Sequence, residues 1–197
     1  MDPSEHVDVQ MAIYSKRFNF VFLHVPKSAG ISMRTALLAS DNDAIEFDNH
    51  ILASEIVAAI GASEFARAYK FAFVRNPWDR AVGLYHFILS DESHAAHQLT
   101  KDMSFPEYLE VYNEKSRSRQ TDWTHDADRQ LVDFIGRFET LQPDFKKVCQ
   151  QIGLEGVELP HLNRSKHADY RSYYTRDMRE AVARSRAFEV SEFRYEF

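Results

Sequence analysis

The stretch FNFVFLHVPKSAGIS, residues 18–32, decides the fold. Its first eight residues are mostly aromatic or β-branched and end at Pro26, which is typical of a buried strand. The following residues join that strand to a helical pattern, and such a turn gathers backbone N–H groups that attract an anion. Lys27 adds a positive charge, Gly30 allows close approach, and Ser32 adds a hydroxyl. The stretch predicts an anion site; the plainer alternative is an ordinary turn with a solvated lysine.

Composition bounds the class of protein. The 197 residues are 44% hydrophobic and 27% charged, with a net charge of −6 and a single cysteine. These values favour one globular domain, predicted over residues 18–197 after an N-terminal extension over 1–17. They disfavour a general nucleic-acid binder and a disulfide scaffold. With no membrane span and no signal peptide in the sequence, we expect a cytoplasmic protein; a chain trimmed from a longer parent could instead derive from a Golgi-anchored one.

Apolar runs alternate with helical patterns along the chain. Two further strands are predicted over 69–75 and 131–138. The predicted helices are 31–39, 54–68, 78–89, 145–152 and 177–188, the last with Thr175 as its N-cap. This alternation predicts a three-layer α/β fold, P-loop-like, with a central parallel sheet flanked by helices.

Arg75 ends the second predicted strand and is followed by Asn76-Pro-Trp-Asp-Arg80. Ligands of open α/β sheets bind at the carboxyl ends of the strands, and a guanidinium there can hold a phosphate through two hydrogen bonds. Ion pairing is the alternative for Arg75. Phosphate contact and an ion pair with Asp79 are equally open for Arg80.

Four segments together resemble sulfotransferases that use 3′-phosphoadenosine 5′-phosphosulfate (PAPS). FLHVPKSAGISMR (22–34) resembles their 5′-phosphosulfate loop, and FVRNPWDRAVGLYH (73–86) resembles their 3′-phosphate motif R-x-P-x-x-R-x-x-S-x-Y. FIGRFETLQPDF (134–145) and LPHLNRSKHADYRSYYT (159–175) are similar to the carbohydrate branch, with its 2-O- and N-acetylgalactosamine-type enzymes and bacterial relatives. The P-loop of nucleoside triphosphate enzymes fits less well, because Lys27 precedes the glycine instead of following it.

The resemblance implies roles for individual residues. Lys27 contacts the bridging oxygen of the phosphosulfate, Arg75 binds the 3′-phosphate, and Lys166 belongs to a segment that closes over the nucleotide. Gly83 stands where the family has serine, which removes one hydrogen bond to that phosphate. The backbone that wraps the 5′-phosphate is given by Pro26, Lys27, Ser28, Ala29, Gly30, Ile31 and Ser32.

Sulfuryl transfer to an alcohol needs a base for the acceptor proton, and histidine titrates near neutral pH. The resemblance implies His50, with Glu46 and Asp48 as alternatives. A surface histidine at a helix start is the other interpretation of His50. His24 and His86 flank the two motifs and are interpreted as packed residues.

Several features have two interpretations. Trp123 either forms an acceptor surface, together with Arg117 and Arg119, or packs a loop onto the domain. A second cluster favours a carbohydrate or nucleotide wall over an RNA-stacking surface. It consists of the tyrosines at 170, 173 and 174 with Arg164, Lys166 and Arg171. His94 and His97 lack the further ligands of a zinc site, so no metal is predicted.

The sequence thus predicts a sulfotransferase with PAPS as donor, adenosine 3′,5′-bisphosphate (PAP) as product and a hydroxyl of a carbohydrate or similar acceptor. No metal and no nucleic acid is expected, and a homodimer is the assembly to consider, since dimers are the commonest oligomers. The alternative is a phosphonucleotide-binding or scaffold protein of the same fold without catalysis, for which Gly83 is the sequence hint. A small-molecule kinase is a third and poorer reading.

Overall fold

The computed structural model describes residues 12–47, 51–114, 119–160 and 167–197. Contacts along the chain divide it into two compact units. The sheet unit comprises residues 1–74 and 120–163, and the helical unit comprises residues 75–119 and 164–197. We describe each by itself. No helix in the described ranges is long and apolar enough to cross a bilayer.

A five-stranded mixed sheet forms the centre of the sheet unit, in the order β3-β1-β2-β4-β7. Its strands are β1 (Ala12–Ser15), β2 (Phe20–Leu23), β3 (Ile45–Phe47), β4 (Tyr69–Val74) and β7 (Phe134–Arg137). β2, β4 and β7 are parallel, with Leu23 opposite Ala72 and Phe71 opposite Phe134. The three strands predicted from the apolar runs are therefore confirmed.

The predicted parallel strands are extended at one edge by antiparallel ones, so the sheet is mixed. β1 pairs antiparallel with both β2 and β3. Only four residues join β1 to β2, and so short a connection permits a hairpin but no parallel crossover. Residues 12–15, which the sequence analysis placed in an N-terminal extension, are thus part of the sheet.

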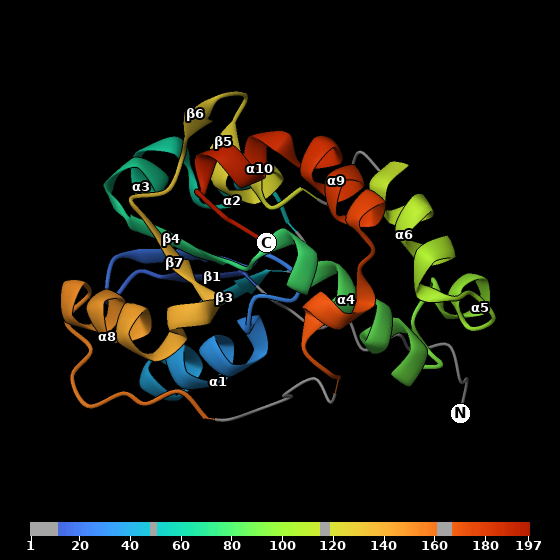
Figure 1. Cartoon of the computed structure of the whole chain (residues 1–197). Coiled ribbons are helices and arrows are strands. Elements are labelled where there is room, and N and C mark those ends of the chain that lie inside the picture. The colour runs from blue at the N-terminus through green and yellow to red at the C-terminus, as the bar shows by residue number, and fades with distance from the viewer. Residues whose placement is uncertain (1–11, 48–50, 115–118, 161–166) are drawn as a thin grey trace. The chain divides into compact units, whose positions relative to one another are not determined.

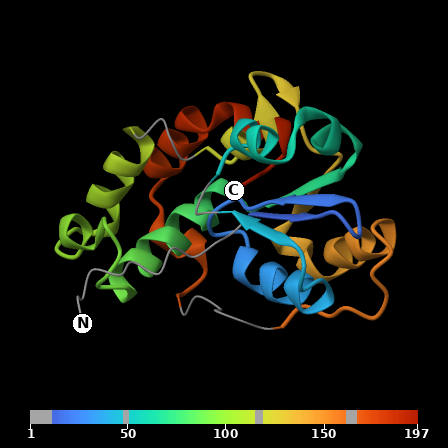
Figure 2. The same ribbon diagram turned by 180° about the vertical axis from the view of Figure 1, so that it is seen from behind.

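Alternating strand residues build a core on each face of the sheet. Phe20, Phe22, Phe71 and Phe73 pack against α1 (Gly30–Ser40) and α8 (Leu141–Gln151). Val21, Leu23 and Ala72 point to the other face, where Ile56 of α2 (Ala53–Ile60) packs. Figures 1 and 2 show α1 and α8 on one side of the sheet and α2 and α3 (Ala62–Arg67) on the other. The predicted three-layer α/β arrangement is confirmed.

Smaller elements complete the sheet unit. They are α7 (Thr121–Thr124), the β5 (His125–Asp126) and β6 (Arg129–Gln130) hairpin, and the short helix η1 (Phe138–Thr140). The helix predicted over 54–68 is broken in two, because Gly61 has a φ of 89° between α2 and α3.

The helical unit contains α4 (Pro77–Ser90), α5 (His97–Thr100), α6 (Phe105–Glu114), η2 (Tyr170–Tyr173), α9 (Arg176–Ser185) and α10 (Ala187–Glu192). α4 lies beside η2, and α6 lies beside α9 (Figure 1). The Thr175 hydroxyl accepts a hydrogen bond from the Met178 N–H, which confirms the predicted N-cap. The helix predicted over 177–188 is interrupted at Arg186, where α9 ends and α10 begins.

Candidate functional site

The loop after β2, predicted to bind an anion, contains two residues in the left-handed conformation. Lys27 and Ala29 have φ values of 68° and 66°, on either side of Ser28. Left-handed conformations cost non-glycine residues free energy, and they are retained where backbone N–H groups must point into a common concavity. α1 begins directly after Ala29, with no side-chain cap and no acidic residue in its first turn. The positive end of this helix dipole is therefore not neutralised by its own first residues.

Ser28 gives the loop an unsatisfied polar group. The residue is fully buried, and its hydroxyl has no hydrogen-bond partner within the part of the chain that the structure describes. A buried hydroxyl without a partner costs free energy, so it calls for an explanation. A ligand oxygen at the loop supplies one, which fits the phosphosulfate predicted there.

The remaining predicted loop residues differ in exposure. Pro26 and Lys27 are half-buried, Ser32 is buried within the first turn of α1, and Ile31 is exposed. All four lie in the loop or the first turn after β2, so the structure brings the predicted loop residues together.

Gly30 is required by His24 in this structure. A Cβ atom added at Gly30 would lie 1.7 Å from Cδ2 and 1.9 Å from Nε2 of His24. The imidazole thus takes the space of a side chain at position 30, and His24 is only 5% exposed. The prediction that His24 is a packed residue is confirmed. The glycine, expected for close approach of a phosphate, makes room for a neighbouring ring.

Arg75 follows β4 directly and belongs to the helical unit. Its prediction as a residue at the carboxyl end of a parallel strand is confirmed. The next residue caps α4: the Asn76 carboxamide oxygen accepts from the N–H groups of Trp78 and Asp79. Pro77 occupies the first helical position, where a missing N–H costs nothing. The sequence Arg-Asn-Pro therefore ends a strand and starts a helix within three residues.

The side chain of Arg75 is held by the first turn of α4. Its Nε lies 2.7 Å from Oδ2 of Asp79, and the two side chains are 6% and 16% exposed. A Cβ atom at Gly83 would lie 2.9 Å from Nη1 of the same guanidinium. Ion pairing of Arg75, which the sequence analysis set against phosphate contact, is thus present in the structure.

The carboxylate of Asp79, the partner considered for Arg80, forms an ion pair with Arg75. Arg80 is 1% exposed, and its Nη1 donates to the Tyr112 hydroxyl across 3.2 Å. The guanidinium is built into the interior of the helical unit. Its structural interpretation is therefore favoured over phosphate contact.

The three tyrosines predicted to form a ligand wall contact α4 and the residue that caps it. The Tyr174 hydroxyl donates to the Trp78 carbonyl oxygen at 2.9 Å, and Asn76 donates to the Tyr170 hydroxyl. The Tyr173 hydroxyl lies 2.8 Å from Nε2 of His86. Burial and like neighbours raise the pKa of Tyr174, so its hydroxyl stays protonated at neutral pH. All three tyrosines remain partly exposed, so the ligand wall stays a prediction.

His86 is part of a histidine pair. Its ring stacks on that of His167 at a centroid distance of 5.4 Å, and burial, together with His167, lowers the pKa of His86. The prediction of a packed histidine fits this environment. His97 is one of the two histidines, with His94, that were considered as zinc ligands. Its Nδ1 lies 2.8 Å from the Ile88 carbonyl oxygen.

Two further predicted residues, Trp123 and Glu46, have definite outcomes. Trp123 is 7% exposed and packs in the sheet core with Ile56, so the acceptor-surface interpretation is wrong and loop packing is right. Glu46 forms an ion pair with Arg34 of α1. His50, Asp48, Arg117, Arg164 and Lys166 lie outside the described residues.

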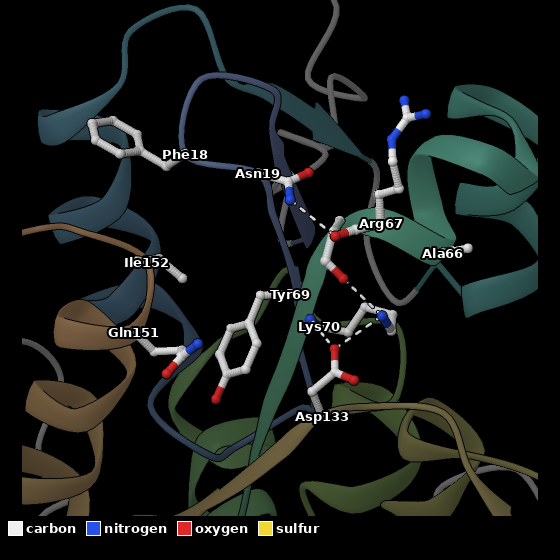
Figure 3. A pocket seen from close by; sticks show the side chains of 10 residues that line it. Phe18, Asn19, Ala66, Arg67, Tyr69, Lys70, Asp133, Gln151 and Ile152 are labelled. Atoms are coloured by element: carbon white, nitrogen blue, oxygen red, sulfur yellow. Dashed lines mark hydrogen bonds and ion pairs between the residues drawn. The ribbon is translucent and has the colours of Figure 1, made fainter.

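A cavity of about 390 Å³ lies at the other end of the parallel strands (Figure 3). Asn19, Tyr69 and Asp133, at the starts of β2, β4 and β7, line it. Lys70 also lines it, but its Nζ lies 2.7 Å from the Ala68 carbonyl oxygen and 2.9 Å from Asp133 Oδ2. Lys70 and Asp133 thus pair with each other, and Arg67, which also lines the cavity, pairs with Glu64. The loop after β2 lies at the opposite end of that strand.

The structure defines a three-layer α/β protein with a turn, left-handed at Lys27 and Ala29, between its first parallel strand and a helix. The model of the sulfotransferase family matches residues 10–192, so the chain belongs to the sulfotransferase family. The crystal structure of mouse sulfotransferase SULT7A1 complexed with PAP is similar in fold, with a TM-score of 0.58 and 12% sequence identity. That similarity covers 90% of this chain and 85% of the mouse chain. An uncharacterized protein of Archaeoglobus fulgidus is 28% identical over 115 residues, which are 57% of this chain and 90% of that protein.

Proposed function

We propose that this chain transfers the sulfuryl group of PAPS to a hydroxyl of a carbohydrate or similar acceptor and releases PAP. The observation that carries the proposal is the loop after β2. Lys27 and Ala29 are left-handed there, and the buried hydroxyl of Ser28 has no hydrogen-bond partner among the described residues. Family membership and the PAP complex of the mouse sulfotransferase support the choice of donor.

The donor supplies an activated S–O bond. In the reaction the acceptor oxygen forms a bond to sulfur, and the bond between sulfur and the bridging phosphate oxygen breaks. Negative charge develops on that bridging oxygen, and Lys27, with the N–H groups of residues 28–32, would stabilise it. We assign the 3′-phosphate to Arg75, whose guanidinium is fixed by Asp79. We assign the acceptor proton to His50, with Asp48 as the alternative; Glu46 is less suited, since Arg34 pairs with it.

The catalytic assignments are tested by turnover. We expect Lys27→Ala and His50→Ala each to lower kcat by about 10²–10³, the scale of losing an oxyanion donor or a general base. PAP should bind the His50 variant as it binds the wild type. If His50→Ala leaves kcat unchanged with the natural acceptor, the base lies elsewhere. Release of PAP from PAPS with a panel of glycans separates an enzyme from a protein that only binds the nucleotide.

The nucleotide assignment is tested by calorimetry with two ligands. Arg75→Ala should weaken PAP binding by about 10- to 100-fold, the effect of losing a charge-assisted hydrogen bond, and leave 5′-AMP binding nearly unchanged. Arg176→Ala is the matched control, because that arginine is 82% exposed on α9. Equal losses for PAP and 5′-AMP would remove Arg75 from the 3′-phosphate.

A further inference from the structure

The guanidinium of Arg75 is held between two residues of one helix face. Asp79 and Gly83 are four residues apart on α4, so they lie one above the other on the same face. Nε of Arg75 is 2.7 Å from Asp79 Oδ2. The other end of the group lies over Gly83, where a Cβ atom would be 2.9 Å from Nη1, 3.4 Å from Cζ and 3.5 Å from Nη2.

The Arg75 guanidinium occupies the space that a side chain at position 83 would need. Any residue other than glycine would place Cβ closer to Nη1 than nitrogen and carbon approach without overlap. Arg75 itself is only 5% exposed, so the guanidinium has little room to move while it keeps its contact with Asp79. Because the clash falls on the end of a long side chain, a substitution at 83 would re-aim Arg75 without unfolding the helix.

We infer that Gly83 and Asp79 are positioning residues that together set the direction of the Arg75 guanidinium, and that Gly83 is required here and is not a degraded serine. This inference rests on the proposed function, because the group so positioned is the one assigned to the 3′-phosphate. A serine at position 83, as in the resembling motif, is not compatible with the present placement of the Arg75 guanidinium. The chain thus lacks the serine hydroxyl as a donor but has a guanidinium held in a fixed direction along the helix.

The first test is independent of ligand. Alanine in place of a glycine within a helix normally stabilises the protein, by about 2–4 °C in Tm for a chain of this size. We expect that rise for Gly83→Ala in the Arg75→Ala background, where the guanidinium is gone. With Arg75 present, Gly83→Ala should give no rise or a fall. An equal rise in both backgrounds would overturn the inference.

The second test uses PAP and 5′-AMP as calorimetric probes on the full chain. Gly83→Ser and Asp79→Asn should each weaken PAP binding by about tenfold or more and leave 5′-AMP binding within about twofold. Asp177→Asn is the matched control for Asp79, because Asp177 is an exposed acid in the first turn of α9. Tighter binding of PAP by Gly83→Ser would overturn the inference. If the effect of Gly83→Ala on Tm depends on Arg75 but the wild type does not bind PAP, the positioning of Arg75 by Gly83 is upheld and the proposed donor is refuted.

Discussion

Asn76 connects three parts of the helical unit through one small side chain, and its removal should be measurable. Its oxygen accepts from the N–H groups of Trp78 at 3.0 Å and Asp79 at 3.4 Å. Its Nδ2 donates to the Glu196 carbonyl oxygen at 2.8 Å. The residue is 7% exposed, so water does not easily replace these contacts.

The two halves of the carboxamide can be separated by mutation. Asn76→Ala loses the N-cap, worth about 1 kcal/mol, and leaves the Glu196 carbonyl without this donor, which adds about 1–2 kcal/mol. The expected loss in free energy of unfolding is therefore about 2–3 kcal/mol. Asn76→Asp keeps the cap acceptor and should lose only about 1–2 kcal/mol.

Urea unfolding followed by tryptophan fluorescence makes the measurement. The chain has two tryptophans, and Trp78 lies in the helical unit while Trp123 lies in the sheet unit. In a Trp123→Phe background the signal reports on the surroundings of Asn76 itself. With an m value of about 2 kcal/mol/M, Asn76→Ala should lower the midpoint by about 1 M urea. A change below about 0.2 M, or an equal loss for Asn76→Asp, would refute the account of the two halves.

Three other predictions concern stability. Thr175→Ala should lower the free energy of unfolding by about 1 kcal/mol, because it removes the N-cap of α9; Thr175→Ser should restore it in the same urea titration. Gly30→Ala should lower Tm by several degrees, about 1–3 kcal/mol of overpacking against His24; a similar loss in a His24→Ala background would contradict this. Since burial lowers the pKa of His86, the folded state disfavours its protonation, so Tm should fall as pH drops below about 6.5. His86→Gln should flatten that slope, and an unchanged slope would assign it to other groups.

The fold was predictable where local pattern and packing agree. The strands around Val21 and Ala72 are continuous apolar runs because both faces of these central strands are covered. β1 and β3 escaped prediction because neither lies in a long apolar run: β1 is Ala-Ile-Tyr-Ser and β3 is Ile-Glu-Phe. Their place in the sheet is set by pairing with β2 and with each other.

The candidate site was likewise predictable where it depends on local sequence and not where it depends on tertiary contacts. The loop from Lys27 to Ser32 was predictable because a strand, a turn and a helix follow one another within a few residues. The partner of Arg75 was not predictable: Asp79 stands beside Arg80 in the sequence, but in the structure it pairs with Arg75, which lies just before the cap of α4. Trp123 was misjudged because its burial depends on α2, more than sixty residues away along the chain. Partners set by tertiary packing are not visible in local composition.

The hairpin of β1 and β2 also bears on the order of assembly. Ile13 pairs with Phe22, nine residues further along, whereas Val21 pairs with Lys70 and Phe71 pairs with Phe134. Closing a short loop loses less chain entropy than closing one of fifty residues or more, so the hairpin forms on a microsecond scale ahead of the parallel pairs. The hairpin then presents the unpaired edge of β2, on which β4 can pair first and β7 afterwards, in sequence order.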